Sequence, residues 1–205
     1  DGPLLVRSAR AEVSVHGDPN TSAPIVAAAL EGIEWAAAAT RAVGFPPPPP
    51  DGGAGGDQGF DLYLGQAHSR SANDALALGT WLDEAVTHGQ LAASTDPSQA
   101  RACAFRTYVE AGLMAADPAE AAIARRGLGE WFTARFGPGP WETGAMERAV
   151  LHPEEGILAS GGAAAALFWE SVSRSHGDAT GRFVREMVQG ARQRTWEGDD
   201  LRGSP

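Results

Sequence analysis

The centre of this 205-residue chain reads Asp96-Pro-Ser-Gln99 and, further on, Asp117-Pro-Ala-Glu120, which are two copies of one helix start signal. In each copy the Asp carboxylate can accept a hydrogen bond from an unpaired backbone N–H, and Pro suits the first helical position. The Gln or Glu at the third helical position can reach back to the cap. The two signals predict consecutive helices over 97–115 and 118–136, the second of which ends at Gly137-Pro138.

Toward the N-terminus, the spacing of apolar residues predicts a strand, a helix and another strand. Within residues 3–16, alternation places Val13 and Val15 on one face, which is typical of a half-buried strand. Apolar residues at helical spacing, after a run of polar capping residues, predict a helix over 22–43. Phe60–Leu64 alternates as a second strand does.

Two further segments lack a clear helix or strand pattern in their sequences. Residues 46–59 hold five consecutive Pro followed by Asp-Gly-Gly-Ala-Gly-Gly. Such a Pro run favours polyproline II and can dock into an aromatic groove, but a spacer loop is the simpler interpretation. Leu76–Val86 fits either a strand or a helix.

The C-terminal third predicts three more helices, near 141–150, over 163–175 and over 179–194. The aromatic residues of the helices at 118–136 and 163–175 are expected to meet in the core, because large rings bury the most area. These aromatic residues are Trp131, Phe132, Phe136, Phe168 and Trp169. We therefore expect an α+β, predominantly helical fold, in which residues 1–195 form one domain with a small N-terminal sheet. Residues 196–205 are expected to form a flexible polar tail.

Composition excludes several classes of protein. The net charge of −10 argues against non-specific binding to nucleic acid, which requires cations that neutralise phosphates. No apolar run approaches the roughly 18–20 residues that a membrane-spanning helix needs. The single cysteine, Cys103, excludes an internal disulfide and a Cys-rich metal site. We expect neither a nucleic-acid partner nor a membrane span.

The common catalytic motifs are also missing. A helical zinc site needs two His three or four residues apart, which places both rings on one face, and no two His have that offset. The five His are His16, His68, His88, His152 and His176. There is no Gly-x-Ser-x-Gly elbow, and the Gly-rich segment lacks the Lys of a phosphate loop.

The two central helices carry the segments Thr107-Tyr-Val-Glu-Ala-Gly-Leu113 and Arg125-Arg-Gly-Leu-Gly-Glu-Trp-Phe132. Together with the preceding helix, the Pro/Gly-rich loop and the strand Phe60–Leu64, they resemble the zincin-like metallopeptidases, specifically the gluzincin type of secreted bacterial metalloproteases. There the active-site helix reads His-Glu-x-x-His, and the next helix supplies a ligand Glu in a pattern like Glu-Gly-Leu-Ala-Glu-Trp. The resemblance covers residues 12–190, in pattern and element order, and implies a zincin-like domain.

Carried over residue by residue, this resemblance implies that the zinc ligands are lost. If Glu110 stands at the general-base position, Val109 and Leu113 occupy the two His positions, and Arg126 occupies the position of the ligand Glu. Zinc needs deprotonated N, O or S donors, and an Arg side chain does not deprotonate. A shifted alignment makes Glu130 the third ligand, but both His stay absent. The resemblance thus implies no metal, no cofactor and no catalysis.

The other interpretation of this region is a plain helical hairpin, in which Val109 and Leu113 are core residues and Glu110 is exposed. An ion pair of a buried Glu110 with Arg126 would give Glu110 a structural role.

We expect a pseudo-metalloprotease that acts as a protein-binding or scaffolding module in an extracytoplasmic assembly, located in the periplasm or outside the cell. A protein partner would occupy the former substrate cleft, with residues 76–86 as a possible strand-pairing edge. The alternative is a hydrolase that uses Glu110 and Glu130 as acid and base without a metal.

Overall fold

The computed structural model describes residues 4–49, 53, 56–66, 70–77, 84–92, 96–116, 122–139, 147, 150–152, 162–178 and 180–191. Within these ranges the fold is α+β and predominantly helical, as the sequence predicts. The strands are β1 (Leu4–Arg7), β2 (Val13–Gly17), β3 (Phe60–Gln66), β4 (Arg70–Ala77) and β5 (Glu84–Ala92). The helices are α1 (Ala23–Val43), α2 (Pro97–Ala116), α3 (Ala122–Phe136), α6 (Gly162–Ser175) and α7 (Arg182–Ala191).

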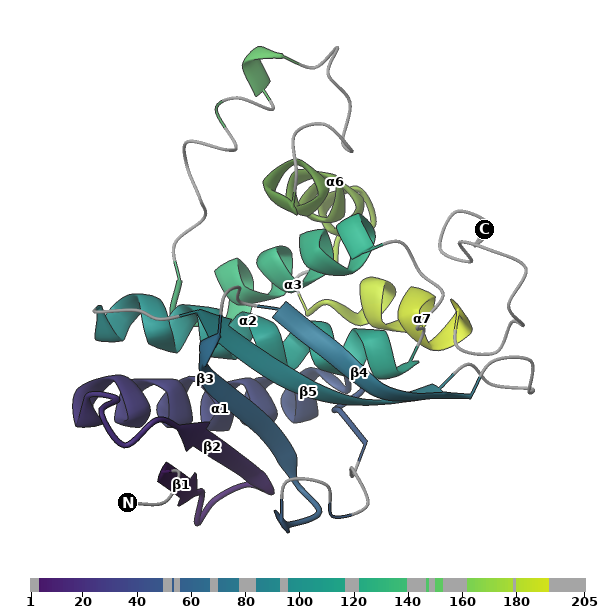
Figure 1. The fold of residues 1–205 in the computed structure, drawn as a ribbon. Coiled ribbons are helices and arrows are strands. Elements are labelled where there is room, and N and C mark those ends of the chain that lie inside the picture. The colour runs from purple at the N-terminus through teal and green to yellow at the C-terminus, as the bar shows by residue number, and fades with distance from the viewer. Residues whose placement is uncertain are drawn as a thin grey trace.

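The strands form one five-stranded sheet in the order β1-β2-β3-β5-β4 (Figure 1). Strands β2, β3 and β5 are parallel, while β1 and β4 are the antiparallel edge strands. The sheet is larger than the two strands that the sequence predicts, because β4 and β5 pair with each other and add to it. The segment 76–86, left open between strand and helix, contributes the end of β4 and the start of β5, while residues 78–83 lie outside the described residues.

The predicted N-terminal strand is in fact two strands joined by a turn. The hydroxyl of Ser8 accepts hydrogen bonds from the backbone N–H groups of Arg10 and Ala11, at 2.9 and 3.0 Å. A Ser side chain that binds nearby backbone in this way stabilises a turn at the expense of a continuous strand. The chain therefore reverses after β1. Val13 and Val15 of β2 are buried as predicted, but Ser14 between them is buried too, so this strand is covered on both faces at that point.

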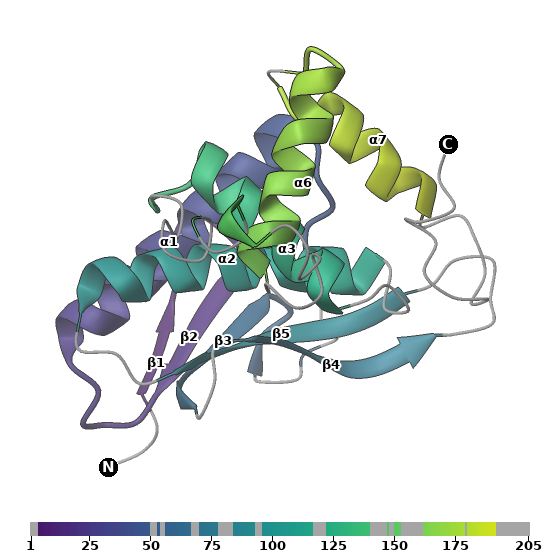
Figure 2. The ribbon, with the colours of Figure 1, turned by 90° about the horizontal axis from the view of Figure 1, so that it is seen from above.

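The helices lie on one side of the sheet (Figure 2). Helices α1 and α2 pack against each other and cover the sheet, where α1 contacts β2 and α2 contacts β5. Helix α3 packs on α2, and α6 packs on α3. One core cluster extends from Val13 of β2 to Val188 of α7 and includes the inward side chains Leu62 and Leu91 of the parallel strands. Among the described residues, no helix is long and apolar enough to cross a membrane.

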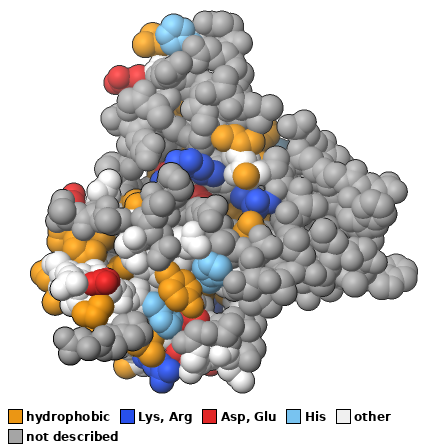
Figure 3. All heavy atoms as spheres, viewed as in Figure 1, with side chains coloured by type: hydrophobic (Ala, Val, Ile, Leu, Met, Phe, Trp, Pro, Cys, Tyr) orange, Lys and Arg blue, Asp and Glu red, His pale blue; other side chains and the backbone are white. Residues whose placement is uncertain are grey.

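The opposite face of the sheet carries a row of rings from three adjacent strands. His16 stacks on Tyr63 with centroids 4.6 Å apart, and Tyr63 meets His88 edge-on at 5.5 Å. His16 Nε2 also lies 2.7 Å from Oδ1 of the buried Asp61. Figure 3 views this face and shows two His side chains on either side of a hydrophobic one.

Most predicted helix ends agree with the structure. Helices α1, α2 and α6 match the predicted ranges 22–43, 97–115 and 163–175. Helix α7 begins three residues later than predicted, because both carboxylate oxygens of Asp178 cap it: Arg182 N–H donates to one at 3.0 Å and Phe183 N–H to the other at 2.8 Å.

Three sequence predictions fall outside the described residues in whole or in large part. They are the second Asp-Pro start signal at 117–120, most of the helix near 141–150, and the polar tail 196–205.

The aromatic residues of α3 and α6 belong to one core cluster, with one exception. Trp131 and Phe132 are fully buried, Trp169 is 3% exposed, and the rings of Phe132 and Phe136 lie 4.8 Å apart. Phe168 is 46% exposed, so its predicted burial is wrong. Neighbouring residues on a helix point about 100° apart, and the face of α6 that buries Trp169 turns Phe168 outward.

Candidate functional site

Helix α2 carries the positions that the resemblance to zincins assigns to the active site. Its start has the predicted cap, because Asp96 Oδ1 accepts a hydrogen bond from Ser98 N–H at 2.9 Å. Further along, the hydroxyl of Thr87 on β5 donates to the carbonyl of Ala111 at 3.2 Å. This bond connects the C-terminal half of α2 to the sheet.

Val109 and Leu113, at the two implied His positions, belong to the hydrophobic core. They are 1% and 4% exposed, and both are members of the main core cluster. Two apolar side chains one helical turn apart offer no lone pair to a metal ion. The plain hairpin predicts this burial, and the degenerate zincin predicts only that these two positions are apolar.

Glu110, at the implied general-base position, is enclosed between α2 and α3, so the exposed Glu110 of the plain hairpin is wrong. Only 12% of its side chain is exposed. A Cβ built on Gly129 of α3 would lie 2.7 Å from Glu110 Cγ, closer than real Cβ contacts allow. Gly129 therefore lets α3 approach α2 where Glu110 stands.

Arg106 joins the two carboxylates of the alternative hydrolase site. Its Nε lies 3.6 Å from Oε1 of Glu110, and its Nη1 donates to Oε1 of Glu130 on α3. Each of these three side chains is 12–13% exposed. Glu110 and Glu130 could be predicted from the sequence, but Arg106 was not among the predicted residues. Its spacing of four residues before Glu110, which places two oppositely charged side chains on one helix face, was the available signal.

The ionisation of Glu110 reflects this enclosure. Burial raises the pKa of the Glu110 carboxyl to about 7, which the charge of Arg106 counteracts and the neighbouring Glu130 reinforces. Oε1 of Glu110 is buried and makes no hydrogen bond in the structure. A carboxylate removed from water is costly to keep charged, and an oxygen without a hydrogen bond does not offset that cost.

Arg126, at the implied position of the ligand Glu, has a minor part in this arrangement. Its side chain is exposed, and its positive charge lowers the pKa of Glu110 less than that of Arg106 does. The ion pair of Glu110 therefore forms within α2, to Arg106, and the ion pair with Arg126 that the sequence left open is not the one present.

The structure thus brings Glu110 and Glu130 together on one guanidinium and places Val109 and Leu113 in the core beside them. In the parts of the chain that the structure describes, no three His, Cys, Asp or Glu side chains gather as a metal site would require. A carboxyl group whose pKa is raised to about 7 can hold or release a proton near neutral pH, as a general acid or base must.

Comparison of the chain with protein-family models, with curated proteins and with solved structures found no match.

Proposed function

We propose that this chain is a non-catalytic domain on a zincin-like frame, a pseudo-metalloprotease that serves as a protein-binding or scaffolding module in an extracytoplasmic assembly. The observation that carries the proposal is the setting of Glu110. It stands where the resemblance places a general base, but it is ion-paired to Arg106 and flanked along the helix by the buried Val109 and Leu113. Without ligands for zinc there is no metal-bound water for Glu110 to activate.

The order of elements supports the zincin-like part of this proposal. A long helix, a Pro/Gly-rich connection and the strand β3 precede α2, and α3 then packs on α2 next to Glu110. This is the order of segments on which the resemblance rests.

The edge strand β4 supports the protein-binding part. It ends the described sheet and pairs with β5 on one side only. A terminal strand presents backbone N–H and C=O groups with which an extended segment of another protein can pair. The end of β4 is part of the segment 76–86 for which the sequence suggested this role.

Zinc binding tests both the zincin-like fold and the loss of its zinc ligands. The wild-type chain, dialysed against zinc and then against buffer, is expected to retain no stoichiometric metal. A variant that restores the implied ligands, Val109→His with Leu113→His and Arg126→Glu, is expected to retain one zinc per chain, provided that circular dichroism finds it folded. Zinc retained by the wild type would refute the proposal that the zinc ligands are lost. If the triple variant is folded but retains no zinc, the match of α2 with the active-site helix of zincins is wrong.

Partner capture from the native source tests the binding role. Consecutive residues of a strand direct their N–H groups to opposite sides, so one of Ser71→Pro and Ala72→Pro blocks the free side of β4 without removing a bond to β5. The better folded of the two variants is expected to lose the partner that the wild type captures, while Glu110→Gln keeps it. Capture that is unchanged by the folded edge variant contradicts a role for β4.

A metal-independent hydrolase is the second candidate, and the raised pKa of Glu110 beside Glu130 favours it. A protonated Glu110 would act as a general acid at neutral pH, and Glu130, which accepts a hydrogen bond from Arg106, would be the second carboxyl group. Hydrolysis that survives chelators but is abolished both by Glu110→Gln and by Glu130→Gln would establish this candidate and displace the non-catalytic one.

A further inference from the structure

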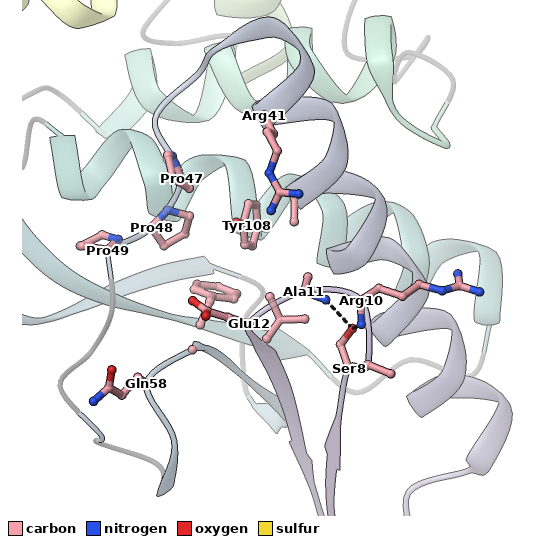
Figure 4. Close-up of a pocket in the computed structure, with 15 residues that line it drawn as sticks. Ser8, Arg10, Ala11, Glu12, Arg41, Pro47, Pro48, Pro49, Gln58 and Tyr108 are labelled. Carbon is pink, nitrogen blue, oxygen red and sulfur yellow. Dashed lines mark hydrogen bonds between the residues drawn. The ribbon is translucent and has the colours of Figure 1, made fainter.

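A cavity of about 600 Å³ lies next to α2, at Tyr108 (Figure 4). Its walls come from the turn between β1 and β2, from α1, from Pro47–Pro49 and from Tyr108 of α2. Neither Arg106, Glu110 nor Glu130 lines it. Its volume falls within the range of about 300–1,000 Å³ that is usual for small-molecule sites. We call it the Arg41 cavity, because Arg41 lines it.

Much of the wall of the Arg41 cavity is apolar. Pro47, Pro48 and Pro49 form one side, and the rings of Phe60 and Tyr108, which meet edge-on at 5.1 Å, form another. Burial raises the pKa of the Tyr108 hydroxyl to about 12, so this ring stays neutral and presents its apolar body to the cavity. Such walls suit an aromatic or aliphatic group of a ligand.

Arg41 supplies the positive charge of this cavity. It projects from the last turn of α1 beside Tyr108 (Figure 4), and within the described part of the chain its guanidinium has no hydrogen bond or ion pair. It also lines two adjoining cavities of about 590 and 350 Å³. The other arginine of the wall, Arg10, extends away from the cavity in Figure 4 and pairs with Glu34 at 3.5 Å.

Glu12 limits the charge that the Arg41 cavity accepts. It lines the same cavity, and Figure 4 places it on the other side of Tyr108 from Arg41. One cation and one anion on separate walls favour a ligand with a single negative group directed to Arg41, since a second negative group would meet Glu12.

We propose that the Arg41 cavity binds a small organic carboxylate, with its apolar body against Tyr108 and Pro48 and its carboxylate paired with Arg41. The planar guanidinium matches a carboxylate through two parallel N–H···O bonds, a geometry that an ammonium group lacks. The proposal does not depend on the function proposed above, because it uses neither the Glu110 cluster nor the edge strand β4.

Calorimetric titration with matched pairs of acids and amides tests this. The probes are phenylacetate and naphthylacetate, each compared with its uncharged amide, on the full chain. The wild type is expected to bind at least one acid about tenfold more tightly than its amide, the effect of one charge-assisted contact. Arg41→Gln is expected to abolish that preference, and Arg41→Lys to restore part of it.

Two variants in the turn between β1 and β2 complete the test, one as a control and one as a second prediction. Arg10→Gln removes a cation that is already paired and is expected to leave the affinity unchanged. Glu12→Gln removes the opposing charge and is expected to raise the affinity for the acid. Thermal melting of each variant verifies that it is folded, which the exposed position of Arg41 on α1 favours.

Three outcomes would overturn the proposal. The first is equal binding of acid and amide, or an acid preference that survives Arg41→Gln. The second is no saturable binding of either acid at millimolar concentration. The third is binding of acetyl-Ala-Ala-Phe with a free C-terminal carboxylate, but not of the small acids, which would assign the cavity to a peptide chain end instead.

Discussion

Arg106 and Glu110 lie one helical turn apart on α2, with Arg106 Nε 3.6 Å from Glu110 Oε1. The cation does not fully offset the burial of its partner, because the pKa of Glu110 is still raised from 4.5 to about 7. The folded protein therefore holds a proton on Glu110 more tightly than the unfolded chain does. This difference makes the stability of the fold depend on pH.

The free energy of unfolding is expected to contain a contribution from Glu110 that is complete below about pH 4.5 and is lost as the pH rises to about 7. The rise of this pKa from 4.5 to about 7 corresponds to about 3 kcal/mol. Urea unfolding of the wild type and of Glu110→Gln, followed across this pH range, measures it. Asp57, Glu170 and Asp178, whose pKa values are lowered, affect both proteins alike and cancel in the difference. Parallel stability curves would contradict the assignment.

Replacing Arg106 with Met is expected to destabilise the fold by about 3–5 kcal/mol at neutral pH, because Glu130 and Glu110 are left enclosed without their cation. In a background that carries Glu110→Gln and Glu130→Gln, the same replacement is expected to cost much less. Urea unfolding of the four proteins gives the coupling energy. Equal losses in both backgrounds would mean that Arg106 acts through packing alone.

Gly127→Ala is expected to destabilise the protein by about 1–3 kcal/mol, the range for overpacking. A Cβ at this position would lie 2.1 Å from the Cβ of Ala165 and would push α3 away from α6. Gly190→Ala on α7 is the matched control, since nothing lies within 4 Å of its built Cβ. There the better helix propensity of Ala is expected to add up to about 1 kcal/mol. Thermal unfolding of both variants checks that the first lowers and the second raises the stability of the fold.

Phe132→Ala is expected to cost about 3–5 kcal/mol, because the ring is fully buried and packs on Phe45 and Phe136. Phe168→Ala, which removes a ring that is 46% exposed, is expected to cost about 1 kcal/mol or less. Urea unfolding of both variants makes the comparison. A similar cost for both would mean that α6 is rotated from the orientation described.

The helices could be predicted from the sequence because their signals are local. Asp96 and the apolar spacing of residues 22–43 determine where two helices begin and end without reference to the rest of the chain. The strands β4 and β5 could not be predicted, because their sequences, Arg70–Ala77 and Glu84–Ala92, mix small, polar and apolar residues. Their state depends on pairing with each other and with β3.

The candidate site was predictable only in part. Spacing and resemblance singled out Glu110 and Glu130 on consecutive helices, and the structure brings both to Arg106. What spacing does not give is the distance between two helices, which Gly129 sets by lacking a side chain. The orientation of α6, on which the exposure of Phe168 depends, likewise follows from packing across helices.

The proline segment 46–49 packs closely on α2, and its backbone is also restricted by its own rings. A Cβ on Gly112 would lie 2.3 Å from the carbonyl oxygen of Pro46, so the segment rests directly on the helix. Each pyrrolidine ring also restricts φ. This wall of the Arg41 cavity therefore loses little conformational entropy when a ligand binds, since its backbone is already immobilised. Replacing these prolines by flexible residues would weaken the binding of a ligand in the cavity. The backbone of the ligand-free protein would then be more mobile at this wall, and binding would have to order it.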